Sequence, residues 1–444
     1  MRLSGRLVVP LIFMVTTLIS WLGPRPAATL TEPVTADLVR RHNEGRLEER
    51  QGLRILRLTG TPYDMGYQHG VLLRHEIRAE LQDQVFETLI LQDRVSHLLL
   101  LQHARHFEGF LPSEYRDELR GLADGAGLSY SDVLLLNSYH DLICESTPRR
   151  GLKELFFSLY PLFIPQMGPT AVLSSAAATA EGDSTANALC HPLEGAFAIF
   201  GQATEDRKLL LGLDFASPPP YLEDLLLIVY RPDVGNAFVA VGWPGKVGVT
   251  IGLNEERISV AGLTSPSQDA SLDGIPLPFL LREVLQYAGD IRTAMRLIAS
   301  AERTTGYNVV IGDGKPADAQ ALEFSAHQYA VFEAENDLVV RTNHYLDPSL
   351  SETQQVSSGS DNETSRARLE ALSHVLSRDF GRMDSSSALN LLRQGYNADR
   401  GDYGTGDRER VLGVLIASSD LEVSVLLHPK GRAASLSVKL DEEL

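Results

Sequence analysis

The sequence has little cysteine and less positive than negative charge. Among its 444 residues are 40 lysines and arginines against 58 aspartates and glutamates, which gives a net charge of −18 at pH 7. A protein that binds nucleic acid usually presents clustered lysine and arginine to the phosphate backbone, so nucleic acid is not an expected partner. Cys144 and Cys190 are the two cysteines, and any thiol chemistry must use one of them.

Three common site signatures are also missing. The G-x-S-x-G turn that surrounds the nucleophile of many serine hydrolases does not occur. His103 and His106 lie three residues apart on an expected helix, but the sequence places no further zinc ligands with them. The sequence GDG at 312–314 lies between two expected strands, which makes it a turn rather than a phosphate-binding loop. We therefore expect neither a metal nor a cofactor.

Residues 1–30 have the order of a signal peptide or a membrane anchor. Arg2 and Arg6 precede an apolar run from Leu7 to Leu22, and prolines and small residues follow. The run is shorter than the about 20 residues of a membrane-spanning helix, which favours a signal peptide. A clean small-x-small cleavage site is missing, so an uncleaved anchor stays open. Either interpretation predicts an extracytoplasmic protein, whether secreted, periplasmic or membrane-anchored.

The rest of the chain changes its periodicity at about residue 190. Apolar residues have helical spacing from about 64 to 142, and a small, polar stretch at 171–189 predicts an exposed loop. After this loop, short segments of alternating apolar residues are separated by turns, which is typical of antiparallel strands. Helical segments interrupt the strands at 276–301, where Asp290 is a plausible helix cap, and at 366–395. We expect an α+β fold with two stacked sheets covered by helices.

A set of segments follows in a fixed order between residue 60 and about residue 375. Among them are GTPYDMGYQHGVLLRHEI (60–77), ELRGLADGAGLSYSDVLLLNSYHDL (118–142), FAIFGQATEDRKLLLGLDF (197–215), WPGKVGVTIGLNEERISVAGL (243–263), RTNHYL (341–346) and TSRARLEAL (364–372). The segment at 118–142 is the most specific. In order and spacing, the set resembles the acyl-coenzyme A:6-aminopenicillanic acid acyltransferase family, a branch of the N-terminal nucleophile hydrolases.

The resemblance implies an αββα sandwich and a precursor that cleaves itself before a cysteine. In such enzymes the cysteine thiol attacks an amide or thioester carbonyl, and the free α-amine of the same residue acts as the base. The acyl group of a small-molecule substrate then passes to water or to an amine. The implied domains are a helical pro-segment or small-subunit-like region at 50–189 and an acyltransferase-like αββα domain at 190–444.

The resemblance also assigns supporting roles to individual residues. Asp214, at the end of the first hairpin, would hold the amine of the nucleophile, and Asn343 would form part of the oxyanion site. Arg368, or less well Arg366, matches the arginine of a Ser-x-x-Arg helix start and would orient the reacting groups together with the carboxylate. Each of these residues also has a structural interpretation, as a turn carboxylate, a loop cap or a surface arginine. At Asn254, in a family turn, the structural role is expected.

The nucleophile position departs from the family pattern. A Cys-Ser/Thr-x-Phe motif precedes the first strand in the family, and counting back from Phe197 places Glu194 at the position of the cysteine. Cys190 lies four residues too early. An Arg-Asn pair beside Asp214 is missing, and Thr264 stands where acylase relatives carry an asparagine near the oxyanion.

Two hypotheses follow for the function. In the favoured one, an insertion has moved the strand start, and Cys190 is the nucleophile of an exported acyltransferase or amidohydrolase that cleaves itself between Leu189 and Cys190. In the alternative, the nucleophile is lost and the protein binds a small molecule or an acyl group. Glutamate cannot perform the self-cleavage, because that step needs a side chain that accepts and then releases an acyl group. A disulfide between Cys144 and Cys190 is a third possibility.

Overall fold

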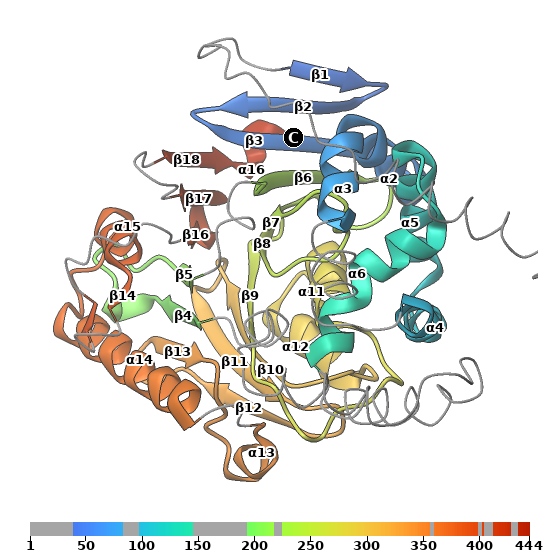
Figure 1. Cartoon of the computed structure of the whole chain (residues 1–444). Coiled ribbons are helices and arrows are strands. Elements are labelled where there is room, and N and C mark those ends of the chain that lie inside the picture. Colours follow the sequence, from blue (N-terminus) through green and yellow to red (C-terminus); the bar gives the residue numbers. More distant parts are fainter. Residues whose placement is uncertain are drawn as a thin grey trace, which may run out of the picture. The chain divides into compact units, whose positions relative to one another are not determined.

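The computed structural model describes residues 39–82, 97–144, 193–216, 224–355, 359–397, 402–403, 412–427 and 434–444. In this part of the chain, strands form the centre and helices lie outside them (Figure 1). Strands β9 (Ile258–Thr264) and β10 (Tyr307–Asp313) are buried at every residue. Because the two faces of a strand alternate along the chain, such burial requires that layers cover both faces of the sheet.

The larger sheet has ten strands in the order β1-β2-β3-β6-β7-β8-β9-β10-β11-β12. Its other strands are β1 (Val39–His42), β2 (Gly45–Arg50), β3 (Leu53–Gly60), β6 (Leu226–Pro232), β7 (Phe238–Gly242), β8 (Ile251–Asn254), β11 (Asp318–Phe324) and β12 (Tyr329–Glu333). Neighbouring strands are antiparallel except β3 and β6, which are parallel. The parallel pair joins the segment before residue 83 to the segment after residue 223 within one sheet.

The smaller sheet has six strands in the order β13-β4-β5-β16-β17-β18. They are β4 (Leu193–Ile199), β5 (Leu210–Ala216), β13 (Leu338–Thr342), β16 (Leu412–Ala417), β17 (Glu422–Leu427) and β18 (Ala434–Lys439). All neighbours in this sheet are antiparallel. A separate pair is formed by β14 (Tyr396–Asn397) and β15 (Asp402–Tyr403).

Helices cover the outer face of each sheet. Those on the ten-stranded sheet are α2 (Pro62–Leu72), α3 (Arg74–Glu80), α4 (His97–Glu108), α5 (Ser113–Ala126), α6 (Tyr130–Cys144), α11 (Leu277–Tyr287) and α12 (Ile291–Ser300). Those on the six-stranded sheet are α14 (Gly359–Arg378) and α15 (Ser385–Gln394). The remaining helices are short: α13 (Pro348–Thr353), α16 (Leu440–Glu443), η2 (Gly201–Ala203) and η3 (Ser418–Asp420). Asp290 caps α12 as expected, because its side chain accepts a hydrogen bond from the Thr293 amide.

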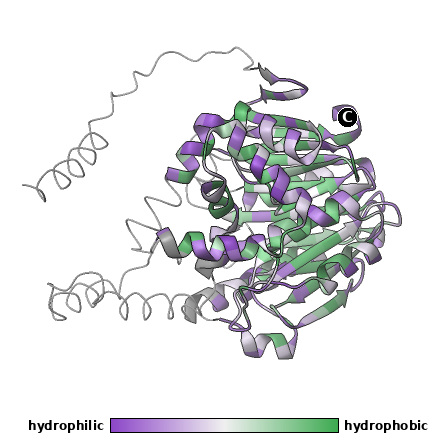
Figure 2. Ribbon diagram, turned by 90° about the vertical axis from the view of Figure 1, so that its right-hand side faces the viewer, coloured by the Kyte–Doolittle hydropathy of each residue, from purple (hydrophilic) through white to green (hydrophobic). Residues whose placement is uncertain are grey.

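Three hydrophobic cores separate four layers. On β9, Val260 faces the helices of the ten-stranded sheet, whereas Ala261 and Leu263 face the six-stranded sheet. On β16, Val414 lies between the sheets and Leu415 lies beneath α14 and α15. The strands in the centre of Figure 2 are accordingly mostly hydrophobic. The order helix, sheet, sheet, helix confirms the αββα sandwich and the α+β class expected from the sequence.

Helices α2 and α5 approach each other through glycines in both. A Cβ atom on Gly66 would overlap the backbone carbonyl of Glu118, and one on Gly121 would overlap the backbone carbonyl of Tyr63. Small residues at such positions allow helix backbones to come into direct contact, because no side chain separates them. The glycines of the segments at 60–77 and 118–142 therefore have a packing role.

Several expectations concern residues outside the described ranges. Residues 1–30 and Cys190 are among them, and of Cys144 only the backbone is described. In the described ranges, no helix combines the length and the apolar character that crossing a membrane requires. The described residues before and after position 190 belong to one compact unit, Leu38–Leu444. Within the region 50–189 that was expected to be helical, residues 53–60 form the strand β3. The division at 189 and 190 stays a prediction.

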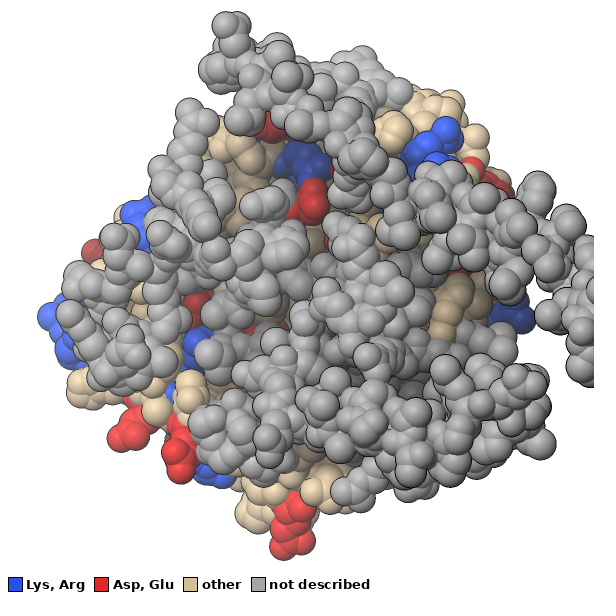
Figure 3. Space-filling model, viewed as in Figure 1, with Lys and Arg blue, Asp and Glu red and all other residues tan. Residues whose placement is uncertain are grey.

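Charged side chains of both signs occur on the surface. On the face shown in Figure 3, the described lysine and arginine side chains are scattered among aspartates and glutamates rather than gathered in one area. That nucleic acid is not a partner stays a prediction from the net charge of −18.

Replacing Gly121 with alanine is expected to lower the free energy of unfolding by roughly 1–3 kcal/mol, because the new methyl group must push α2 and α5 apart. Gly289→Ala is the matched control, since nothing lies within 4 Å of a Cβ atom there, and its effect should stay within about 0.5 kcal/mol. Urea denaturation followed by circular dichroism measures both. Equal stability of the two variants would contradict the direct helix contact.

Candidate functional site

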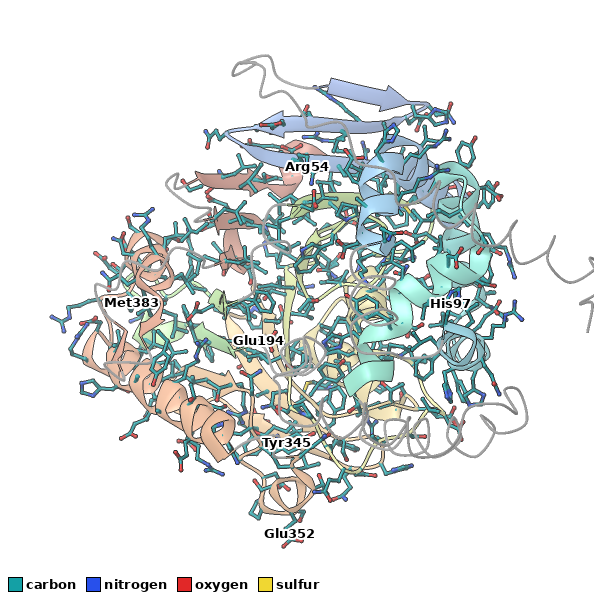
Figure 4. All side chains as sticks on the ribbon, viewed as in Figure 1. Arg54, His97, Glu194, Tyr345, Glu352 and Met383 are labelled. Atoms are coloured by element: carbon teal, nitrogen blue, oxygen red, sulfur yellow. The ribbon has the colours of Figure 1, made fainter. Side chains whose placement is uncertain are left out.

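Glu194 lies at the beginning of β4, in the interior of the sandwich (Figure 4). On this strand Ala196 and Ala198 face the ten-stranded sheet, and the alternation of a strand turns Glu194 in the same direction. Only 3% of the residue is exposed. A carboxylate with this little exposure needs hydrogen-bond donors, because burial without partners costs several kcal/mol.

One oxygen of the Glu194 carboxylate accepts three hydrogen bonds. Its Oε2 atom lies 2.8 Å from the backbone nitrogen of Thr264, 3.0 Å from Thr264 Oγ1 and 2.9 Å from Asn343 Nδ2. Asn343 Oδ1 accepts a hydrogen bond of 2.8 Å from the backbone N–H of Glu194. Asn343 thus contacts both the backbone and the side chain of Glu194, which fixes the orientation of its amide.

The backbone around Asn343 is fixed by a buried asparagine on β10. The side chain of Asn308 donates to the carbonyl oxygens of Thr342 and His344 at 2.7 and 2.8 Å, one on each side of Asn343. The neighbouring residue on β10, Tyr307, pairs with Thr264 at the end of β9. Strand β10 therefore fixes both residues that donate to Glu194: it pairs with β9, which ends at Thr264, and it bonds through Asn308 to the backbone around Asn343.

A buried ion pair fixes the loop that follows Asn343. Glu323 on β11 pairs with Arg341 on β13 at 2.9 Å, so the pair connects the two sheets. The other oxygen of Glu323 accepts hydrogen bonds from the amides of Leu346 and Asp347 at 2.8 and 2.9 Å. The loop is thus held on both sides of the candidate site.

Burial dominates the electrostatics of Glu194. It raises the pKa of this carboxyl to about 7, although the hydrogen bonds from Thr264 and Asn343 and the charge of His140 act in the opposite direction. His140 lies near the end of α6, so this helix approaches the site from the helical side of the sheet. Near neutral pH the carboxyl is therefore divided between its protonated and ionised forms.

A second buried carboxylate belongs to the same polar cluster. Asp141 accepts hydrogen bonds from Thr304 Oγ1 at 2.5 Å and from the Tyr307 hydroxyl at 2.7 Å. Burial raises the pKa of Tyr307 well above its ordinary value, and the charges of Asp141 and Glu194 add to this effect. Tyr307 therefore stays a neutral hydrogen-bond donor to Asp141.

The expected residues Asp214 and Arg368 form a different contact on the opposite face of the smaller sheet. Asp214 Oδ2 lies 3.5 Å from the guanidinium of Arg368 and 3.4 Å from the backbone nitrogen of Tyr396. Both side chains are 1% exposed. The pair faces α14, whereas Glu194 faces the ten-stranded sheet, although Asp214 is the cross-strand neighbour of Gly195.

Three further residues were considered as candidates from the sequence: Arg366, Asn254 and Cys190. Arg366 is exposed on α14, which favours Arg368 as the match to the helix-start arginine. Asn254 has the structural contacts expected of it, since its side chain donates to the carbonyls of Leu285 and Ala288 and accepts from the Ile258 amide. The predicted nucleophile Cys190 lies outside the described residues, so its role stays a prediction.

Sequence reasoning identified the position of Glu194 but missed two buried polar residues near the site. Asn308 could have been noticed as a polar residue within the apolar strand pattern YNVVIGD. Asp141 lies within the segment SYHDL, the end of the most specific family segment. In both cases the signal is a polar residue where the periodicity requires burial.

The described part of the site offers hydrogen-bond donors for a negatively charged oxygen. Thr264 and Asn343 are arranged as donors to an oxyanion would be, but a carboxylate of the chain itself accepts their hydrogen bonds. Among the described residues, no group of histidine, cysteine, aspartate and glutamate side chains could hold a metal ion.

Comparison with known families agrees with the sequence segments. The model of the acyl-coenzyme A:6-aminopenicillanic acid acyl-transferase family matches residues 207–400, which confirms the resemblance. The match contains Asp214, Asn343 and Arg368 and excludes Cys190 and Glu194. It supports an acyltransferase or amidohydrolase type of protein and does not include the nucleophile position.

Curated relatives cover most of this chain. An uncharacterized protein of Archaeoglobus fulgidus is 29% identical over 388 residues, which are 80% of this chain and 60% of the relative. Protein dcd1A of Dictyostelium discoideum is 23% identical over 378 residues, which are 77% of this chain and 74% of the relative. The chain thus spans less than two thirds of the archaeal relative.

Two solved structures show a distant likeness. A variant of conjugated bile acid hydrolase from Clostridium perfringens aligns with 56% of this chain and 93% of its own, at 13% identity and a TM-score of 0.42. The N-acylethanolamine-hydrolyzing acid amidase ortholog of Caenorhabditis elegans aligns with 51% of this chain and 93% of its own, at 11% identity and a TM-score of 0.37. The fold assignment rests on the layers described above.

The raised pKa of Glu194 predicts how the free energy of unfolding changes with pH. Its ordinary pKa is 4.5 and its folded-state pKa is about 7, so the folded state binds more protons between these values. The free energy of unfolding should therefore fall as pH rises from about 4.5 to about 7, and level off above, with a total change of about 3 kcal/mol from this residue. Urea denaturation across this pH range measures it.

Glu194→Gln should lose this component of the pH profile, because glutamine does not titrate. Glu370→Gln, at an exposed position of α14, is the control and should keep the wild-type profile. If wild type and Glu194→Gln had parallel profiles, the raised pKa would be ruled out.

Proposed function

We propose that this chain binds an acylated small molecule, or an acyl group, at the site around Glu194 and does not use a thiol there. One observation carries the proposal: the carboxylate at the family's nucleophile position accepts the hydrogen bonds of Thr264 and Asn343. During acyl transfer such donors stabilise the oxyanion, and catalysis depends on their being free for it. With Glu194 in place, the donors are occupied before any substrate arrives.

The nitrogen of Glu194 supports the same proposal. Self-processing enzymes use the free α-amine of the nucleophile as base. While residue 193 is joined to residue 194, this nitrogen is an amide, and it donates a hydrogen bond to Asn343. An amide nitrogen in this role cannot accept a proton from a nucleophile. The retained donors can recognise the carbonyl of a ligand once that ligand displaces the Glu194 side chain.

A second candidate function keeps Cys190 as the nucleophile. It is favoured by the position of β4, which begins at Leu193 and thus three residues after Cys190. In this candidate the chain cleaves itself between Leu189 and Cys190, and the thiol then attacks an amide or a thioester. Both candidates share export through residues 1–30, which leads to a secreted, periplasmic or membrane-anchored protein.

Under reducing conditions, the purified wild-type chain is expected to run as one intact polypeptide on a denaturing gel, because a glutamate at the nucleophile position cannot accept an acyl group. Intact-mass measurement gives the same answer independently. Cys190→Ala should then leave the fragment pattern unchanged. Two fragments that meet at Leu189 and Cys190, and that disappear in Cys190→Ala, would establish the second candidate instead.

Glu194→Cys is expected to produce self-cleavage between residues 193 and 194. The new thiol can attack the carbonyl carbon of residue 193, so that a thioester forms while the peptide C–N bond breaks and frees the α-amine of residue 194. Water then hydrolyses the thioester, which releases the thiol and the carboxylate of residue 193. Thr264 and Asn343 would stabilise the oxyanion of this step. Mass spectrometry of the fragments, with the α-amine at residue 194 as new terminus, measures the outcome.

The control for this experiment is Glu194→Ala, which frees the same donors but supplies no nucleophile and should stay intact. Adding Asn343→Ala to the cysteine variant should slow cleavage by about 10²–10³, the usual effect of losing one oxyanion donor. An intact Glu194→Cys chain that is folded would show that the site has lost the geometry of acyl chemistry.

A further inference from the structure

Strand β12 is the last strand of the ten-stranded sheet, at the end opposite to β1 (Figure 1). No described strand pairs with its outer side. Its five residues, YAVFE, include no lysine, arginine or proline, and their pairing with β11 continues without a bulge. Proteins usually protect free sheet edges with such features, because an unprotected edge can pair with a strand of another chain. The edge of β12 lacks this protection.

The other edges of the two large sheets carry positively charged residues. The sequence of β1, VRRH, has two arginines. In the smaller sheet, β13 carries Arg341 at one edge, and β18 carries the exposed Lys439 at the other. Charged side chains disfavour pairing with a further strand. The one charged residue of β12 is Glu333, at the end of the strand.

The turn before β12 shows which of its backbone groups point outward. At this turn, the Ser325 N–H donates to the Gln328 carbonyl oxygen at 3.0 Å. Hydrogen-bonded and non-hydrogen-bonded residue pairs alternate along antiparallel strands. Counting from Gln328, every second residue of β12 bonds to β11, and the residues between them direct N–H and C=O away from the sheet. These outward residues are Tyr329, Val331 and Glu333.

The side chains of the same three residues share one face of the strand and are exposed. Tyr329 is 53% exposed and Val331 is 47% exposed, which is unusual for large apolar side chains on a strand. The guanidinium of Arg303 lies 5.7 Å from the centre of the Tyr329 ring. Outward backbone groups and exposed apolar side chains thus occur together at this edge.

We propose that β12 is the interface of a homodimer, in which the β12 strands of two copies pair antiparallel about a two-fold axis at Val331. This register is the one in which all five residues of both strands overlap. It places each outward residue opposite an outward residue, so that the pair can exchange both backbone hydrogen bonds. The two ten-stranded sheets would then form one continuous sheet.

The sequence of β12 suits a second copy as its partner. In the two-fold register, Val331 packs against Val331 of the second copy, and the Tyr329 hydroxyl lies opposite Glu333 of the second copy, whose carboxylate can accept its hydrogen bond. Parallel pairing in register would instead place the two Glu333 carboxylates side by side. Five residues per strand make a small interface, so the dimer should be weak and form at micromolar to millimolar concentration.

The first test is sedimentation velocity of the purified full chain from micromolar to millimolar concentration. The wild type should pass from monomer to dimer over this range. Val331→Lys should weaken the association more than about tenfold, because it places two like charges at the two-fold axis. Val234→Lys is the matched control, since Val234 is 69% exposed in the turn between β6 and β7, and it should associate as the wild type does. Circular dichroism checks that both variants are folded.

The second test fixes the register by disulfide formation, in a chain with Cys144→Ala and Cys190→Ala. In a hydrogen-bonded antiparallel pair, the two Cα atoms lie about 5.5 Å apart, a separation that a disulfide can bridge. Val331→Cys should therefore give a covalent dimer with oxidised glutathione. Tyr329→Cys should not, because its neighbour in the second copy is Glu333.

A wild-type chain that stays monomeric at millimolar concentration would overturn the proposal. So would association that Val331→Lys leaves unchanged, which would place the interface on another surface. Equal covalent dimer formation by Val331→Cys and Tyr329→Cys would refute the two-fold register. None of these outcomes depends on the proposed function, which is decided by the fragment pattern of the wild-type chain.

Discussion

The hydrogen bonds that join Asn343 and Glu194 to Thr264 hold the candidate site together, because they connect the two sheets at their ends. Asn343 follows β13 of the smaller sheet and bonds to both the backbone and the side chain of Glu194 on β4, while it also donates to Thr264 on the larger sheet. Asn308 supports this contact from β10. The side-chain amide of Asn343 thus joins the ends of β13, β4 and β9, and Asn308 on β10 fixes the backbone that carries it.

The residues expected from the family resemblance lie in two separate buried polar groups with different properties. Asp214 has a guanidinium partner in Arg368 and lies beneath α14, where an opposite charge compensates its burial. Glu194 has only neutral donors and a nearby histidine, so burial prevails and its pKa rises to about 7. The two carboxyl groups therefore lie in different environments, the first in an ion pair and the second among neutral hydrogen-bond donors.

The sequence predicted the architecture better than the site. Alternating apolar segments such as YNVVIGD and RISVAGL became β10 and β9, because a strand between two covered faces must be apolar along most of its length. The position of Glu194 followed from counting along a family motif. The roles of Asn308 and Asp141 did not follow, since both depend on contacts with residues far away in the sequence, such as His344 and Thr304. The pairing of β3 with β6 could not be predicted for the same reason, because the helical region separates the two strands in the sequence.

The burial of Glu194 lowers the stability of the fold near neutral pH, and this loss bears on the role of the residue. A buried carboxylate with a raised pKa destabilises the fold near neutral pH, and the surrounding hydrogen bonds offset only part of this cost. A purely structural residue at this position would be expected to reduce the cost, either through a cationic partner, as at Asp214, or through a neutral side chain. Glu194 does neither, although Asn343 and Thr264 could equally bond to an uncharged acceptor. Perturbed pKa values are common at functional sites, so the raised pKa of Glu194 favours the proposed functional role of this side chain over a purely structural one.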